Sequence, residues 1–200
     1  MANLGIMQSI NTDHPIWERF FTVNPLVIVG SKEEDGRYDL APKHMAFPMG
    51  WKNYFGFVCT PRHGTYQNIK RTGEFSVSYP KPTQVVVTSL TATPRCDDDT
   101  KPGLDILPQV PAEKIDSVFV EDSYLQLECK LEKIVDGFGE NSLITGQVVN
   151  ALVDENSLRN EDKDDNDLIF HEPLLAYLAP GRYAVIKQSH SFPFPKDFKK

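Results

Sequence analysis

One arginine and three hydrogen-bonding side chains gather where a buried segment runs into a predicted short helix. Thr60 and Arg62 precede this helix, and Thr65 and Asn68 lie in its first turns. A guanidinium group suits a phosphate, and hydroxyl and amide groups add directional hydrogen bonds. The free N–H groups at the start of a helix also favour an anion. The residues together predict a site for a small phosphorylated ligand.

Each of these residues also has an ordinary structural explanation. Arg62 taken alone is most simply a surface arginine, because arginines usually lie at the surface. Thr65 and Asn68 are common at the start of a helix, and Gly73 is placed to end the helix in the left-handed conformation. Only the joint pattern favours a binding site over these explanations.

Strands must position this cluster, because most of the surrounding sequence alternates or forms short apolar runs. We expect a short helix at 12–21, with Thr12 or Asp13 as its N-cap, and a helix at 65–73, with Thr65 capping its start. We expect strands at 25–30, 37–41, 54–60, 74–79, 125–132, 142–153 and 181–186.

The remaining segments are less regular. Residues 80–111 are rich in Pro, Thr and Asp, residues 154–167 form an acidic loop, and 174–178 form a helical turn or a strand. Many short strands and few helices predict a mainly β fold, a closed antiparallel barrel without exposed edges. Without a repeat or a linker, we expect residues 1–200 to form one domain.

Composition excludes several classes of function. A net charge of −7 argues against a nucleic-acid partner, which needs a basic face. Apolar runs are too short to cross a bilayer, and no secretory signal precedes them. Cys59, Cys96 and Cys129 are far apart and lack zinc spacing, so we expect no metal and a reducing, cytoplasmic location. The acidic run 162–167 does not complete a calcium loop.

Three segments then carry a resemblance to a known family: Asp39–Pro48 (DLAPKHMAFP), Gly56–His63 (GFVCTPRH) and Thr65–Phe75 (TYQNIKRTGEF). In order and spacing they resemble the flavin reductase-like family of FMN-binding split barrels, which includes flavoredoxins. The resemblance covers residues 22–80, weakens over 81–115 and recovers after residue 127. It implies a six-stranded split barrel, FMN as cofactor, and a homodimer with the flavin at or near its interface.

The resemblance also assigns roles to a second set of residues. It places the flavin ring on the loop 41–47, where small residues permit close approach, larger ones pack on the ring, and Lys43 or His44 stabilises the reduced flavin. Pro42 departs from the family, because it lacks an N–H for a backbone contact. A lysine is expected near the flavin at Lys101, although an exposed loop lysine is an equal alternative. The expected ring residues are Ala41, Pro42, Lys43, His44, Met45, Ala46 and Phe47.

The function that the resemblance implies is an NAD(P)H-dependent flavin reductase. Reduced nicotinamide would pass electrons through FMN to an acceptor or to free flavin, and the cofactors would supply the hydride chemistry without a protein acid or base. One alternative is a non-enzymatic FMN-binding electron carrier without a nicotinamide site. Another is a β-barrel interaction module in which the basic cluster is incidental.

Overall fold

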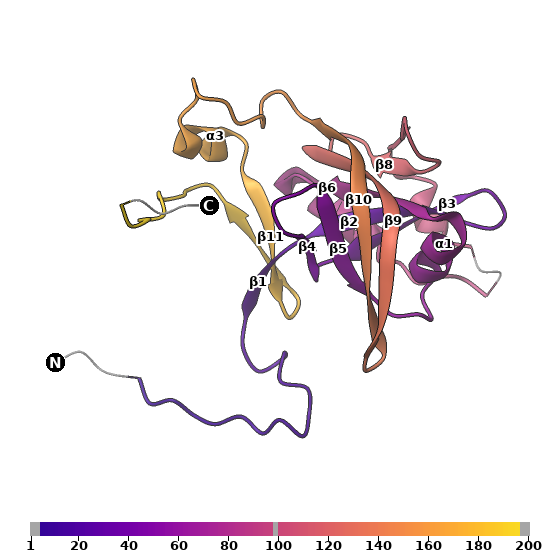
Figure 1. The fold of residues 1–200 in the computed structure, drawn as a ribbon, viewed down its shortest axis with the longest axis horizontal. Helices are drawn as coiled ribbons and strands as arrows, with labels where there is room; N and C mark the ends of the chain where they lie inside the picture. The colour runs from indigo at the N-terminus through magenta and orange to yellow at the C-terminus, as the bar shows by residue number, and fades with distance from the viewer. Residues whose placement is uncertain (1–4, 98–99, 197–200) are drawn as a thin grey trace.

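Seven antiparallel strands form the main sheet of the computed structural model, which describes residues 5–97 and 100–196 (Figure 1). The strand order is β3-β2-β6-β9-β10-β5-β4. This curled sheet confirms the predicted mainly β split barrel, with one strand more than expected because the short β4 is separate. The strands are β2 (Val27–Lys32), β3 (Tyr38–Lys43), β4 (Ala46–Pro48), β5 (Tyr54–Cys59), β6 (Glu74–Tyr79), β9 (Leu125–Phe138) and β10 (Asn141–Val153).

The barrel is split between β3 and β4. These strands lie at the two ends of the sheet order, although only His44 and Met45 separate them along the chain. Residues 41–47, expected as a loop, are therefore mostly strand. This expectation was wrong because Ala41 pairs with β2 and Ala46 pairs with β5, which leaves only a two-residue turn.

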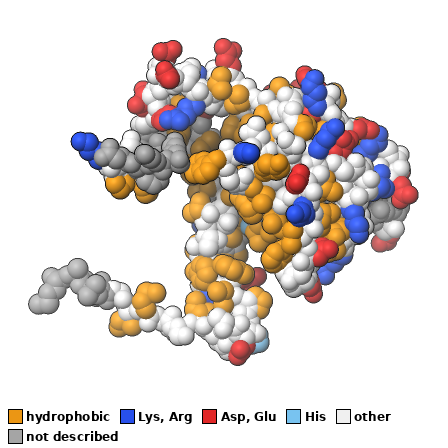
Figure 2. Space-filling view, in the orientation of Figure 1, with side chains coloured by type: hydrophobic (Ala, Val, Ile, Leu, Met, Phe, Trp, Pro, Cys, Tyr) orange, Lys and Arg blue, Asp and Glu red, His pale blue; other side chains and the backbone are white. Residues whose placement is uncertain are grey.

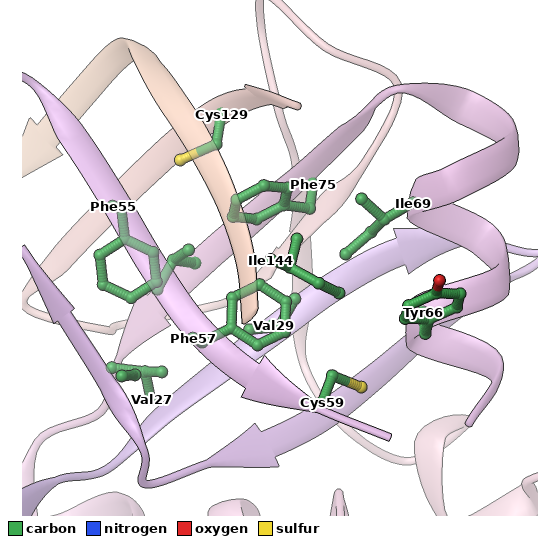
Figure 3. Packing of buried hydrophobic residues seen from close by; sticks show 12 residues of the cluster. Val27, Val29, Phe55, Phe57, Cys59, Tyr66, Ile69, Phe75, Cys129 and Ile144 are labelled. Carbon is green, nitrogen blue, oxygen red and sulfur yellow. The ribbon is translucent and has the colours of Figure 1, made fainter. Parts of the chain in front are cut away.

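Aromatic and β-branched side chains fill the barrel interior (Figure 3). Phe57 of β5 and Phe75 of β6 meet edge to face, with ring centroids 5.4 Å apart. Helix α1 (Gly64–Thr72) packs Ile69 into the same cluster. Val77 also lies there, two residues after Phe75 and so on the same face of β6.

Residues 80–111 contain more structure than their composition indicates. Helix α2 (Val85–Leu90) forms although three consecutive valines disfavour a helix through their restricted side-chain rotamers. Val87 and Leu90 pack against Ile28 and Leu40, so tertiary packing decides the local conformation. The neighbouring short elements are η1 (Pro82–Gln84), η2 (Pro102–Leu104), β7 (Gln109–Pro111) and β8 (Val118–Val120).

A second, three-stranded sheet stands beside the barrel (Figure 1). Its order is β1-β11-β12, formed by β1 (Thr22–Pro25), β11 (Leu174–Ala179) and β12 (Arg182–Ile186). Residues 174–178, predicted as either a helical turn or a strand, are therefore a strand. The last predicted strand is confirmed.

Two local predictions were wrong. Residues 12–21 form turns and bends instead of a helix, and Trp17 and Phe21 are about two-thirds exposed. A helix of this length needs an apolar face to pack against, and this segment has none in the single chain. The acidic loop contains α3 (Asp165–His171), because the Asp164 carboxylate caps it by accepting from the N–H groups of Asn166 and Asp167. Within the described ranges, no helix has the length and apolar character to span a membrane.

Candidate functional site

The N-terminus of α1 has no side-chain cap. His63 is the N-cap residue in extended conformation, and its side chain makes no capping hydrogen bond, so the prediction of Thr65 as the cap was wrong. The His63 carbonyl accepts from the N–H groups of Tyr66 and Gln67. Gly73 ends the helix with φ of 76°, as predicted. Among the described residues no side chain caps this end, so the amides that the His63 carbonyl does not take up, those of Gly64 and Thr65, remain suited to an anion.

Arg62 lies beside this helix start on the surface. Its Nη1 is 3.4 Å from Glu140 Oε2, and both side chains are more than 70% exposed. Such an exposed pair contributes little to stability, so Arg62 can leave it at small cost. The Thr60 hydroxyl donates to Asn141 Oδ1 at 3.1 Å.

Thr65 and Asn68, expected at the same anion, are buried under the helix. The Thr65 hydroxyl is 3.5 Å from Asp39 Oδ2, and Asn68 Nδ2 donates to Ser31 Oγ at 3.1 Å. These hydrogen bonds hold α1 against β3 and β2. The structure therefore gives both side chains a positioning role, and direct ligand contact stays a prediction.

Arg95 was missed at the sequence level, yet it reaches the start of α1 from the irregular middle segment. Its Nη2 contacts the Glu33 carboxylate and lies 3.6 Å from Asp39 Oδ2. A Cβ built on Gly64 would lie 2.8 Å from the same Nη2 atom. The guanidinium thus lies against the first helical residue, which is possible because that residue is glycine. No spacing rule in the sequence marks this arginine.

Lys101 belongs with Glu33, Asp39 and Arg95 to one charged cluster. Its Nζ donates to Asp39 Oδ1 at 3.0 Å and to the Leu40 carbonyl at 2.8 Å. Asp39 is nearly buried, with a side-chain exposure of 6%, and so has two cations within reach. The predicted ligand lysine is therefore a partly buried residue with structural partners.

A groove of about 170 Å³ opens at the split of the barrel. It joins the predicted ring residues of the β3–β4 turn to only one residue of the predicted phosphate group, Thr60. The other predicted residues, Arg62, Thr65, Asn68 and Lys101, do not line it. Ala41 and Ala46 face the protein interior, with 8% and 3% exposure, so only their backbones are available to a ligand. Phe47 is 41% exposed on β4. The groove is lined by Pro42, Lys43, His44, Met45, Val58, Cys59, Thr60, His63 and Asn141.

The two histidines of the groove are held neutral near pH 7. Burial, aided by the charge of Lys43, lowers the pKa of His44. Burial also lowers the pKa of His63, with Lys43 and Arg62 acting in the same direction and Asp39 opposing them. Among the described residues that line the groove, Lys43 therefore supplies the positive charge, and Arg62 lies outside the lining but close enough to lower the pKa of His63.

The buried thiols do not suit redox chemistry. Burial raises the pKa of Cys59, although the Lys43 charge opposes this, and burial raises the pKa of Cys129 to about 12. Both therefore remain protonated near neutral pH. Both side chains are buried and pack in the core as small apolar residues. In the parts of the chain with described positions, no three His, Cys, Asp or Glu side chains are grouped to hold a metal ion.

A larger cavity of about 300 Å³ shares Pro42 and His44 with the groove. Helix α2 and the turn between β11 and β12 form its other walls. The ring of His44 packs on that of Tyr177, with centroids 4.7 Å apart and planes inclined by 40°. Tyr177 Oη accepts from the Gly181 N–H at 2.9 Å, which ties the turn to the strand.

Comparison with known proteins points to one family. The profile of the flavin reductase like domain matches residues 20–185. The fold is similar to nitrilotriacetate monooxygenase component B from Bacillus cereus, with a TM-score of 0.80, 20% identity, and coverage of 94% of this chain and 100% of that one. No curated protein matches at a significant level.

Two further solved structures share this fold. Flavoredoxin of Desulfovibrio vulgaris (Miyazaki F) has a TM-score of 0.74 and 19% identity, over 94% of this chain and 99% of that one. The FMN-binding protein from Thermus thermophilus with bound p-hydroxybenzaldehyde has a TM-score of 0.75 and 19% identity, over 94% and 100%.

Proposed function

Because the chain belongs to the flavin reductase like family, with a flavin-binding role of oxidoreductase type, we propose that it binds FMN and passes electrons from NADH or NADPH to an acceptor. The observation that carries this proposal is the uncapped start of α1, whose N-cap residue His63 lines the groove together with Lys43. Residues 1–200 would form one flavin-binding domain that acts as a homodimer. Relatives named as flavoredoxin and as FMN-binding protein support the choice of cofactor.

The residues present fit an FMN phosphate at the start of α1. The start of the helix offers amide donors, and Arg62 lies beside it with an exposed carboxylate partner that it can leave. Arg95 lies against Gly64, held there by Glu33 and Asp39. An anion there would also benefit from the partial positive charge of the helix end. Thr65, Asn68 and Lys101 would act from beneath, because they position α1 and Asp39.

The groove at the β3–β4 turn fits the ring. Bound flavin would supply hydride- and electron-transfer chemistry, which no side chain of this groove provides alone. Met45 and Phe47 are half-exposed apolar side chains at its rim. Lys43, rather than the neutral His44, would place positive charge where the reduced ring needs it. The backbone of Ala41 and Ala46 would approach the ring, and Pro42 would contribute its ring surface but no N–H.

A titration of the purified protein with FMN and with riboflavin tests the assignment. FMN should bind more tightly, because the proposed anchor is the phosphate. Arg62→Ala should weaken FMN binding about tenfold to a hundredfold through loss of a charge-assisted contact, and it should leave riboflavin unchanged. Arg159→Ala, which removes an exposed arginine paired with Asp165, is the matched control.

Addition of NADH or NADPH to the FMN-loaded protein tests the electron donor. Bleaching of the flavin absorbance would support a reductase. Bound flavin that no nicotinamide bleaches would identify the electron-carrier alternative. Equal affinities for FMN and riboflavin would contradict the phosphate anchor, and absence of flavin binding would leave only the interaction-module alternative.

A further inference from the structure

The 300 Å³ cavity beside the groove is lined mainly by apolar and aromatic residues. Its floor is apolar, with Leu26 and Val85, and Tyr177 and Tyr183 contribute aromatic rings. Aromatic rings prefer partners that stack or meet edge to face. Ligand cavities range from about 300 to 1,000 Å³, so this one is at the small end and suits one substituted ring.

The cavity also has a single cationic wall. Arg182, on β12 at the hairpin turn, lines it, and no Asp or Glu of the described residues does. Across residues 5–97 and 100–196, the ion pairs do not include Arg182. In a chain with net charge −7, an arginine without a carboxylate partner beside an apolar cavity is available to an external anion. A guanidinium binds a carboxylate through two parallel hydrogen bonds.

The two cavities meet at Pro42 and His44, which line both. A ligand in the larger cavity would therefore lie next to a ring in the groove. His44 is neutral near pH 7 and packs on Tyr177, so it offers a flat apolar face and no competing charge. The two cavities are thus neighbours that share one neutral wall.

We propose that this cavity binds a small aromatic carboxylate as the second ligand of the site, with Arg182 on the carboxylate and Tyr177 and Tyr183 around the ring. That the ligand lies beside a flavin rests on the proposed function. Binding of the carboxylate by the cavity does not depend on the proposed function.

Benzoate is the probe, and benzyl alcohol is its neutral counterpart. Titration calorimetry on the protein without flavin and on the FMN-saturated protein should show saturable benzoate binding in both. Benzyl alcohol should bind at least tenfold more weakly. Arg182→Gln should reduce benzoate affinity tenfold or more and leave benzyl alcohol and FMN unchanged. Arg159→Gln, an exposed arginine outside the cavity, should change none of these affinities.

The outcomes separate this proposal from the proposed function. Benzoate binding that persists in a protein unable to bind FMN would support the cavity ligand and contradict the flavin role. Mutual displacement of benzoate and FMN would show that the flavin itself fills the cavity and would overturn the proposal. Absence of saturable binding, or binding that Arg182→Gln does not weaken, would also overturn it.

Discussion

At the scale of single residues, the contact between Gly64 and Arg95 links the charged cluster to the helix. Glu33 and Asp39 hold the guanidinium on one side, and the bare backbone of Gly64 receives it on the other. Any side chain at residue 64 must displace it. The atom displaced is the end of a flexible side chain, so the fold can accommodate the change.

We predict that Gly64→Ala keeps the protein stable, because alanine is the better helix residue, but weakens FMN binding about tenfold, a loss of about 1.4 kcal/mol. Arg95→Gln should cause a similar loss, and the double variant should lose no more than either single one. Fluorescence titration with FMN and riboflavin measures all three variants. Additive losses in the double variant would show that the two residues act separately.

At the scale of elements, a buried carboxylate on β9 anchors the loop that precedes β8. Glu128 is fully buried and accepts from the N–H groups of Lys114 (2.6 Å) and Ile115 (3.0 Å) and from Asn150 Nδ2 (2.7 Å). Burial acts to raise the pKa of Glu128, but these hydrogen bonds more than offset it and hold the pKa below its ordinary value. The loop is therefore tied to the barrel by an ionised group.

This anchor predicts acid sensitivity. With the folded-state pKa below the unfolded one, stabilisation is complete above the unfolded value of about 4.3 and is lost as the pH falls toward the folded value. Glu128→Gln should lower the free energy of unfolding at pH 7 by about 1–3 kcal/mol and reduce its loss between pH 5 and pH 3. Urea denaturation at each pH measures both effects.

Glu132→Gln is the control, because Glu132 is an exposed residue of the same strand. It should leave the pH dependence of stability unchanged. If Glu128→Gln keeps the slope of the natural protein between pH 5 and pH 3, another group causes the acid sensitivity.

The elements also show what sequence patterns can predict. Alternation of apolar and polar residues predicted the β9–β10 hairpin, and Gly73 predicted the end of α1, because both signals are local in the sequence. Helix α2 was not predicted, because packing of Val87 and Leu90 against the core outweighs the local preference of the valines. The turn at 44–45 was predicted only as part of a longer loop, because the residue at which a strand ends depends on its partner strand. Arg95 could not be predicted, because its position depends on contacts with residues 31 to 62 positions away.

At the scale of the whole molecule, the N-terminal segment extends away from the barrel and carries hydrophobic side chains (Figures 1 and 2). Met7 is 94% exposed, and Trp17, Phe21 and Val23 are between 65% and 71% exposed. Exposed apolar surface of this kind marks an interaction site. We expect a second copy of the chain to cover it.

Sedimentation at micromolar concentration should therefore give about twice the chain mass of 22.6 kDa. Trp17→Ser with Phe21→Ser should raise the monomer fraction at least tenfold, because the segment loses its apolar contact area. Trp51→Ser, which removes an 89% exposed tryptophan outside this segment, is the matched control. A monomer at all concentrations would contradict the homodimer.

The groove and the larger cavity are built by different parts of the fold, which determines where substitutions are tolerated. The groove is bounded by strands of the main sheet, whose residues also build the core. The neighbouring cavity is walled mostly by α2 and the β11–β12 turn, which lie outside that sheet. Substitutions at Ser89, Ala92 or Tyr183 can therefore reshape the second cavity without disturbing the barrel. Mutation libraries confined to these positions offer a route to new ligand preferences at little cost in stability.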